Sequence, residues 1–107
     1  MSELDLSTLI EVTKFETGAG EANVEMVAAL AGYRIEVFKI LVSNHSGGAI
    51  VSNPKSNATA IGPAFRVADN TIEQATGKWI TVVGEPFTMT RTADVDYTVY
   101  YRYNYGS

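Results

Sequence analysis

The segment GYRIEVFKILVSN, residues 32–44, decides the fold class, because it is dense in Ile, Val, Phe and Leu and is bounded by a glycine and a polar loop. This composition predicts a long central β-strand. Apolar and polar side chains alternate at first, but two apolar residues, Val37 and Phe38, then stand next to each other. We therefore expect either a strand covered on both faces or a β-bulge near Phe38. A bulge would let Phe38, Ile40 and Val42 continue the buried face.

The segment VDYTVYYRYNY, residues 95–105, is the second long strand that the sequence predicts. Side chains of one kind recur at every second position along it, which is the period of a β-strand. One face carries four tyrosines and a valine: Tyr97, Val99, Tyr101, Tyr103 and Tyr105. Since the other predicted strands are shorter, we expect these two to anchor the domain together, in one sheet or in facing sheets.

Shorter strands are predicted in the rest of the chain, separated by turns rich in Gly, Pro, Asn and Asp. They cover residues 10–16, 23–30, 49–52, 59–61, 64–67, 79–83 and 87–92. About eight strands, with turn signals about every 8–12 residues, predict an all-β sandwich or small barrel. We take the antiparallel β-sandwich as the expected fold.

Three stretches have weaker signals. The alanines of residues 23–30 are also compatible with a short helix, although their β neighbours favour a strand. Residues 53–57, NPKSN, predict a turn. Gly77 is expected to close the weakly patterned residues 71–76 before the next strand begins at Trp79.

Composition and charge disfavour several classes of partner. The chain has 107 residues, 46% of them hydrophobic, which suffices for one domain with its own core. We expect residues 1–20 to form an N-terminal arm or first strand, and residues 21–107 to form the sandwich. The 12 acids and 8 bases give a net charge of −4, and the bases are scattered, so nucleic-acid binding is disfavoured. No apolar run is long enough to cross a membrane, and no signal peptide is evident.

No constellation of residues predicts catalysis, a metal site or a cofactor, and we expect a protein that is not an enzyme. His45 is the only histidine and adjoins Ser46, but a catalytic pair also needs an orienting carboxylate and an oxyanion hole. Asp94 and Asp96 would project to one side of a strand, where they could hold a cation or act in acid–base chemistry. Such a pair more often faces water or protects a strand edge.

Five aromatic side chains are the candidates for a protein interface: Phe15, Trp79, Tyr100, Tyr103 and Tyr105. Tyrosine combines an apolar ring with a polar hydroxyl, so rows of it occur in cores, in protein interfaces and in sugar-binding platforms. Along the last strand we expect the row to pack inward as far as Tyr101 and to emerge near the terminus.

The layout of four segments resembles the small jelly-roll capsid decoration (cement) proteins of tailed bacteriophages. These segments are MVAALAGYRIEVFKILVSN, IVSNPKSNATAIGPAF, GKWITVVGEPFTMT and VDYTVYYRYNY, and the resemblance covers about residues 23–105. It implies a jelly-roll and a virion structural protein without catalytic residues. It also implies binding to the major capsid protein, self-association as a homotrimer, and a place on the capsid surface after synthesis in the host cytoplasm. Residues 1–20 could contact the shell as an arm, with Gly18-Ala19-Gly20 as its hinge.

Two other functions stay open. The first alternative is a carbohydrate- or receptor-binding β-sandwich module, from a phage tail or a secreted glycan-active protein, with Trp79 or the tyrosine row as its platform. The second is a small enzyme that uses Asp94 and Asp96.

Overall fold

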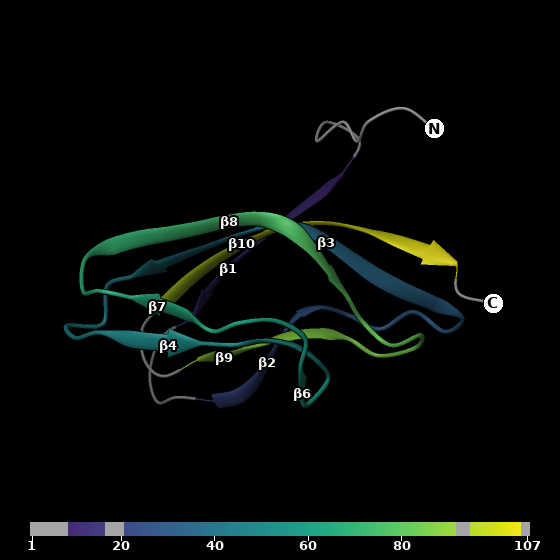
Figure 1. The fold of residues 1–107 in the computed structure, drawn as a ribbon, viewed down its shortest axis with the longest axis horizontal. Helices are drawn as coiled ribbons and strands as arrows, with labels where there is room; N and C mark the ends of the chain where they lie inside the picture. The colour runs from purple at the N-terminus through teal and green to yellow at the C-terminus, as the bar shows by residue number, and fades with distance from the viewer. Residues whose placement is uncertain (1–8, 17–20, 92–94, 106–107) are drawn as a thin grey trace.

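The computed structural model describes residues 9–16, 21–91 and 95–105; at residues 14–16, 21, 22 and 91 it describes the backbone alone. Within these ranges the chain forms ten β-strands and no helix. Eight strands make two four-stranded antiparallel sheets that lie face to face as the layers of a sandwich (Figure 1). The predicted all-β antiparallel sandwich is confirmed, and two further short strands form a small sheet of their own.

The first sheet has the strand order β1-β10-β3-β8. Its strands are β1 (Ile10–Glu16), β10 (Val95–Tyr105), β3 (Tyr33–Asn44) and β8 (Thr71–Ile80). The second sheet has the order β2-β9-β5-β6 and consists of β2 (Glu21–Val27), β9 (Phe87–Arg91), β5 (Pro54–Ser56) and β6 (Thr59–Ala60). The small sheet pairs β4 (Ile50–Ser52) with β7 (Phe65–Val67).

The two long strands, β3 and β10, are neighbours at the centre of the first sheet. Their antiparallel register runs from Val95 opposite Asn44 to Tyr105 opposite Tyr33. Of the two arrangements that the sequence allowed, the single sheet is therefore the correct one.

A β-bulge interrupts this pairing at Phe38, as the broken alternation predicted. Tyr100 lies opposite Lys39 and Tyr101 lies opposite Val37, so Phe38 has no partner on β10. Phe38 is buried as expected, with 9% of it exposed, but it does not belong to the cluster that contains Ile40 and Val42. Its ring lies beneath two cationic groups on the outer face of the sheet, 5.2 Å from the Arg102 guanidinium carbon and 6.0 Å from Lys78 Nζ. The extra residue shifts the phase, so that the buried positions resume at Ile40.

The core lies between the two main sheets and takes side chains from both. Its fully buried members, less than 2% exposed, include Ile35, Val37, Ile40, Val42, Phe87, Met89, Val95, Tyr97 and Val99. A buried tyrosine hydroxyl needs a hydrogen-bond partner. The Tyr97 hydroxyl has one, because it donates to the backbone carbonyl of Thr90 at 2.9 Å. Tyr97 and Val99 thus pack inward as predicted.

Residues 23–30, for which a helix was the alternative, contribute to strand β2. Val24 and Met26 are 5% and 3% exposed, while Glu25 between them is exposed. This alternation, together with pairing to β9, excludes the helix. The strand ends at Val27, and residues 28–32 form the connection to β3.

Two local predictions were wrong. Gly77 does not end a strand: β8 runs through it from Thr71 to Ile80, and residues 81–86 form a loop. Among the described strands, β8 pairs with β3 alone, and the register between these strands is irregular around Gly77, so a residue without a side chain is accommodated there. The predicted turn at residues 53–57 contains β5. Proline is tolerated as its first residue, and the Pro54 carbonyl accepts a hydrogen bond from the backbone N–H of Ile61 at 3.0 Å.

The predicted N-terminal arm is only partly within the described residues. Residues 10–16 form edge strand β1, which pairs with β10 from Ile10 opposite Tyr101 to Glu16 opposite Val95. Residues 1–8 and the proposed hinge at residues 18–20 lie outside the described ranges, so the arm stays a prediction. None of the described segments forms a helix capable of crossing a membrane.

Candidate protein-interaction surface

Three segments that are distant in sequence meet at one end of the sandwich: the connection at residues 28–32, the loop at residues 81–86 and the last residues of β10 (Figure 1). The backbone N–H of Gly84 donates to the Tyr33 carbonyl at 2.8 Å. A Cβ placed on Gly32, whose φ is +83°, would lie 3.7 Å from the Tyr105 ring. These contacts hold the three segments next to one another at this end of the molecule.

Four apolar side chains at this end are exposed to solvent. Their exposed fractions are 42% for Leu30, 60% for Val82, 38% for Val83 and 66% for Tyr105. We call these four residues the end patch. Single exposed apolar residues are common, whereas a large group of them at one end of a protein is a candidate interaction site.

Tyrosine rings of β3 and β10 pack edge to face next to the end patch. The ring centroids of Tyr33 and Tyr105 are 5.5 Å apart, and those of Tyr101 and Tyr103 are 5.7 Å apart. The Tyr103 hydroxyl donates to the Ala28 carbonyl at 2.7 Å, which ties β10 to the connection after β2. Burial raises the pKa of Tyr103, and the nearby Tyr101 and Glu25 raise it further, so this hydroxyl keeps its proton at neutral pH.

The loop at residues 81–86 is held in place by polar contacts from the second sheet. Ser56 is buried, and its hydroxyl donates to Glu85 Oε1 at 2.6 Å while accepting the backbone N–H of Val82 at 2.9 Å. On the other side of the loop, the backbone N–H of Ile35 donates to Thr81 Oγ1 at 2.8 Å. The exposed valines are therefore presented by a fixed loop.

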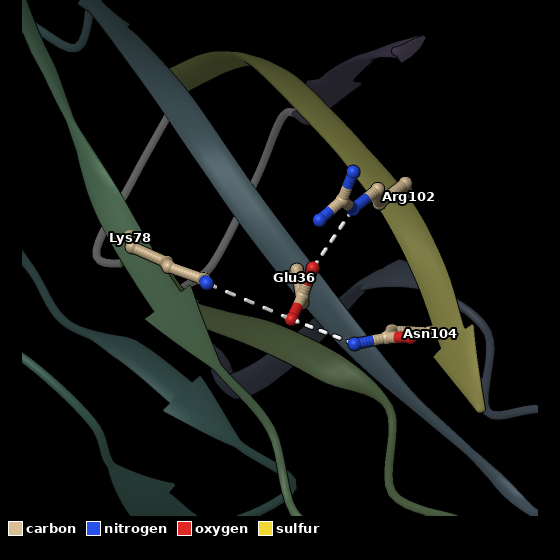
Figure 2. Close-up of polar contacts among 4 residues, drawn as sticks. All are labelled: Glu36, Lys78, Arg102 and Asn104. Carbon is tan, nitrogen blue, oxygen red and sulfur yellow. Dashed lines mark hydrogen bonds and ion pairs between the residues drawn. The ribbon is translucent and has the colours of Figure 1, made fainter. Parts of the chain in front are cut away.

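A buried carboxylate holds the strands that carry the patch (Figure 2). Glu36 on β3 has a side chain only 5% exposed and accepts hydrogen bonds from Arg102 Nε at 2.8 Å and Asn104 Nδ2 at 3.0 Å, both on β10. Lys78 Nζ on β8 lies 3.8 Å from the same carboxylate. Arg102 and Asn104 alternate along β10 with the tyrosines, so Glu36 fixes the strand whose opposite face presents Tyr103 and Tyr105.

The charge of Glu36 is stabilised in spite of its burial. Burial alone would raise the pKa of Glu36, but hydrogen bonds from Arg102 and Asn104 and the positive charges of Lys78 and Arg102 outweigh it. The pKa of Glu36 is consequently lowered from its ordinary value of 4.5. A buried acid paired in this way is ionised throughout the neutral range.

The structure brings together two of the five predicted interface residues. Tyr105 belongs to the end patch and Tyr103 supports it. Tyr100 lies on the outer face of the first sheet, where its hydroxyl donates to Glu11 Oε2 at 3.0 Å; this hydrogen bond raises the pKa of Tyr100. The backbone of Phe15 lies opposite Asp96, but its side chain is outside the described residues.

Trp79 lies elsewhere, in a groove between β7 and β8. It packs partly against the core, and its ring centroid is 6.3 Å from that of Phe65. The groove has a volume of about 240 Å³, and none of its lining residues belongs to the end patch. The Trp79 groove is thus a second, separate feature of the surface.

The chemical candidates of the sequence do not form a catalytic site in the described part of the chain. His45 Nε2 lies 3.1 Å from Asp96 Oδ1, so it does have a carboxylate partner. The Ser46 hydroxyl, however, donates to the Gly48 carbonyl at 2.9 Å instead of to His45. Asp94 lies outside the described residues. Among those that are described, no three His, Cys, Asp or Glu side chains are placed to hold a metal ion.

Known proteins do not assign a role to these features. No family model matches the chain, and the search of curated proteins gives no match either. A function therefore has to be argued from the end patch, the Glu36 contacts, the strand order and the Trp79 groove.

Sequence reasoning missed most of the end patch and the role of Glu36. It placed Val82 and Val83 inside a strand, because two adjacent valines are typical of one. The following Gly84, with a φ of +83°, was the available signal that the chain turns there. Glu36 carried no signal, since an acid that alternates with apolar residues usually faces water.

Proposed function

We propose that this chain is a virion structural protein, a decoration (cement) protein that stabilises a bacteriophage capsid through protein–protein contacts. The end patch is the observation that carries the proposal. It is an exposed apolar surface that contains a tyrosine and is presented by fixed backbone. Protein interfaces are enriched in such aromatic residues, and their strongest contacts lie at apolar centres.

The strand order supports the finer assignment of a jelly-roll. The chain passes alternately between the two main sheets, with β1, β3, β8 and β10 in the first sheet and β2, β5, β6 and β9 in the second. Apart from the β5–β6 hairpin, the paired strands of both main sheets are not consecutive in the chain, as Greek-key connections require. Jelly-rolls, built from two Greek keys, are typical of viral capsid and lectin domains.

The end patch could supply a modest binding free energy to each capsid contact. Fully burying one large apolar side chain contributes about 1.5–3 kcal/mol before the costs of association. Four partly exposed side chains therefore supply a modest interface. Such a contact becomes effective through repetition, because linked copies bind with high avidity.

The proposed partners follow from the resemblance. The major capsid protein would receive the end patch, and a homotrimer on the capsid surface would supply the avidity. The part of the predicted arm that precedes β1 would add main-chain contacts to an exposed strand edge of the shell.

The proposal is tested by co-sedimentation of the full chain with capsid shells of the bacteriophage that encodes it. Val82→Asp and Tyr105→Asp should each reduce binding about tenfold or more, because a charge is placed in an apolar contact. Their thermal melts should change little, since both side chains are exposed.

Ile72→Asp is the matched control. Ile72 is 62% exposed, close to the 60% of Val82, but it lies at the opposite end of β8 from the loop at residues 81–86. Equal binding of wild type, Val82→Asp and Ile72→Asp would reject the end patch as the capsid contact.

A further inference from the structure

The Trp79 groove has the features of a small ligand site, which the proposed capsid contact does not use. Two aromatic side chains, Phe65 from β7 and Trp79 from β8, form its apolar part. Three polar side chains, Arg66, Glu73 and Gln74, also line it. Ligand sites commonly combine an apolar surface with a few convergent polar groups.

The Trp79 indole is held in one position by the backbone around it. A Cβ on Gly62 would lie 2.7 Å from the indole Nε1, closer than real contacts allow, so the ring occupies space that only glycine leaves free. On its other edge, a Cβ on Gly77 would lie 3.6 Å from the indole Cη2. The ring is therefore packed closely between these two glycine positions. A ring fixed in this way loses little conformational entropy when a ligand stacks on it.

The polar side chains of the groove are available to a ligand. Arg66, Glu73 and Gln74 are exposed, and the described part of the chain gives them no hydrogen bond or ion pair. Arginine supplies only donors, the carboxylate only acceptors, and the amide supplies both. The charges of Arg66 and Glu73 cancel, so the groove does not select for an anion or a cation.

We infer that the Trp79 groove binds a neutral saccharide ring. A pyranose has an apolar C–H face that stacks on an aromatic ring, and an edge of hydroxyl groups that donate and accept at the same time. The indole and the three polar side chains match these two parts. The volume of about 240 Å³ is somewhat below the roughly 300–1,000 Å³ of drug-sized ligand sites, which fits one ring.

The test uses the full chain and its own fluorescence, because Trp79 is the only tryptophan. The protein is titrated with the methyl glycosides of glucose, galactose, mannose and N-acetylglucosamine. At least one glycoside should change the tryptophan emission saturably. Because a single sugar ring makes few contacts, we expect a dissociation constant of about 1 mM or weaker.

Substitutions on the exposed rim locate the binding without disturbing the core. Glu73→Gln and Arg66→Ala should each weaken the saturable response about tenfold, because each removes charge-assisted hydrogen bonds. Thr76→Ala, also exposed on β8 but outside the groove lining, should leave it unchanged.

Three results would overturn the inference. The first is no saturable response to any of the four glycosides at their solubility limits. The second is a response that both rim variants retain in full, which would place the binding elsewhere. The third is a response confined to sialic acid, titrated alongside the four glycosides as an anionic comparison, because the groove should take a neutral ring.

Discussion

Glu36 shows how one side chain can position a surface that it does not touch. Its carboxylate joins Arg102 and Asn104 of β10 to Lys78 of β8, and the tyrosines that support or form the end patch alternate with Arg102 and Asn104. Because Arg102 is 38% and Lys78 52% exposed, both cations can be hydrated if the acid is removed. Removal of the Glu36 carboxylate should therefore lower the free energy of unfolding only moderately.

Glu36→Gln should lower the free energy of unfolding by about 1–3 kcal/mol, because it replaces charge-assisted hydrogen bonds with neutral ones. Urea unfolding measures this. The control is Glu11→Gln, which alters an exposed hydrogen bond to Tyr100 and should change stability by no more than about 0.5 kcal/mol. Equal stability of wild type and Glu36→Gln would contradict the role given to Glu36.

Glu36 should also make the free energy of unfolding depend on pH. The pKa of Glu36 is lower in the folded state than its ordinary 4.5, so between these two values the unfolded state binds more protons. The contribution of Glu36 is fully present above the unfolded pKa and is lost as the pH falls through the folded pKa. In urea unfolding from pH 7 downward, the stability difference between wild type and Glu36→Gln should therefore shrink below about pH 4.5. A difference that stays constant with pH would contradict this linkage.

Among the elements, β3 is the one whose irregularity the sequence predicted. Two adjacent apolar residues cannot both continue a period-two pattern, and the bulge resolves the conflict at Phe38, which has no partner on β10. The sequence could not assign Phe38 to a face, because the cationic groups that cover it come from β8 and β10.

Deleting Phe38 should therefore preserve the fold. Val37 and Lys39 would become adjacent, as their partners on β10 already are, and Ile40 would stay buried opposite Val99. Stability should fall by about 2–4 kcal/mol, because a buried aromatic side chain is lost. Dispersed amide NMR signals would report the retained fold.

Deleting Ile40 instead is the matched control. It would put Lys39 at the buried position opposite Val99, and a single-residue slip of this kind exchanges the two faces of a strand. This variant should lose its dispersed amide signals. If the two deletions behaved alike, the bulge at Phe38 would not have the role described.

The other elements show where sequence patterns are informative. The limits of β1 and β10 follow from strict alternation, whereas β5 was hidden in a turn-like segment and β8 in a weakly patterned one. Strand β8 is mostly exposed, so it lacks the apolar alternation that identifies a half-buried strand.

For the whole molecule, the end patch could not be predicted, because its residues come from three segments that only the fold brings together. Tyr105 was singled out from its place in the aromatic row, whereas Leu30 had no local signal and the two valines had only that of the following Gly84. Local periodicity thus predicted the layers of the sandwich and not the surface at which they end.

Self-association is also a property of the whole molecule. We expect sedimentation equilibrium of the full chain at micromolar concentration to give a homotrimer, the state that the resemblance to decoration proteins implies. A mass of one chain, 11.6 kDa, at every concentration would contradict this expectation.

The capsid contact is tested most directly by a cryo-electron microscopy reconstruction of capsid shells decorated with the full chain. We predict ordered density for the sandwich on the outer capsid surface, with Leu30, Val82 and Tyr105 of the end patch against the shell. Density in which this end faces solvent, or shells without added density at saturating protein, would contradict the account.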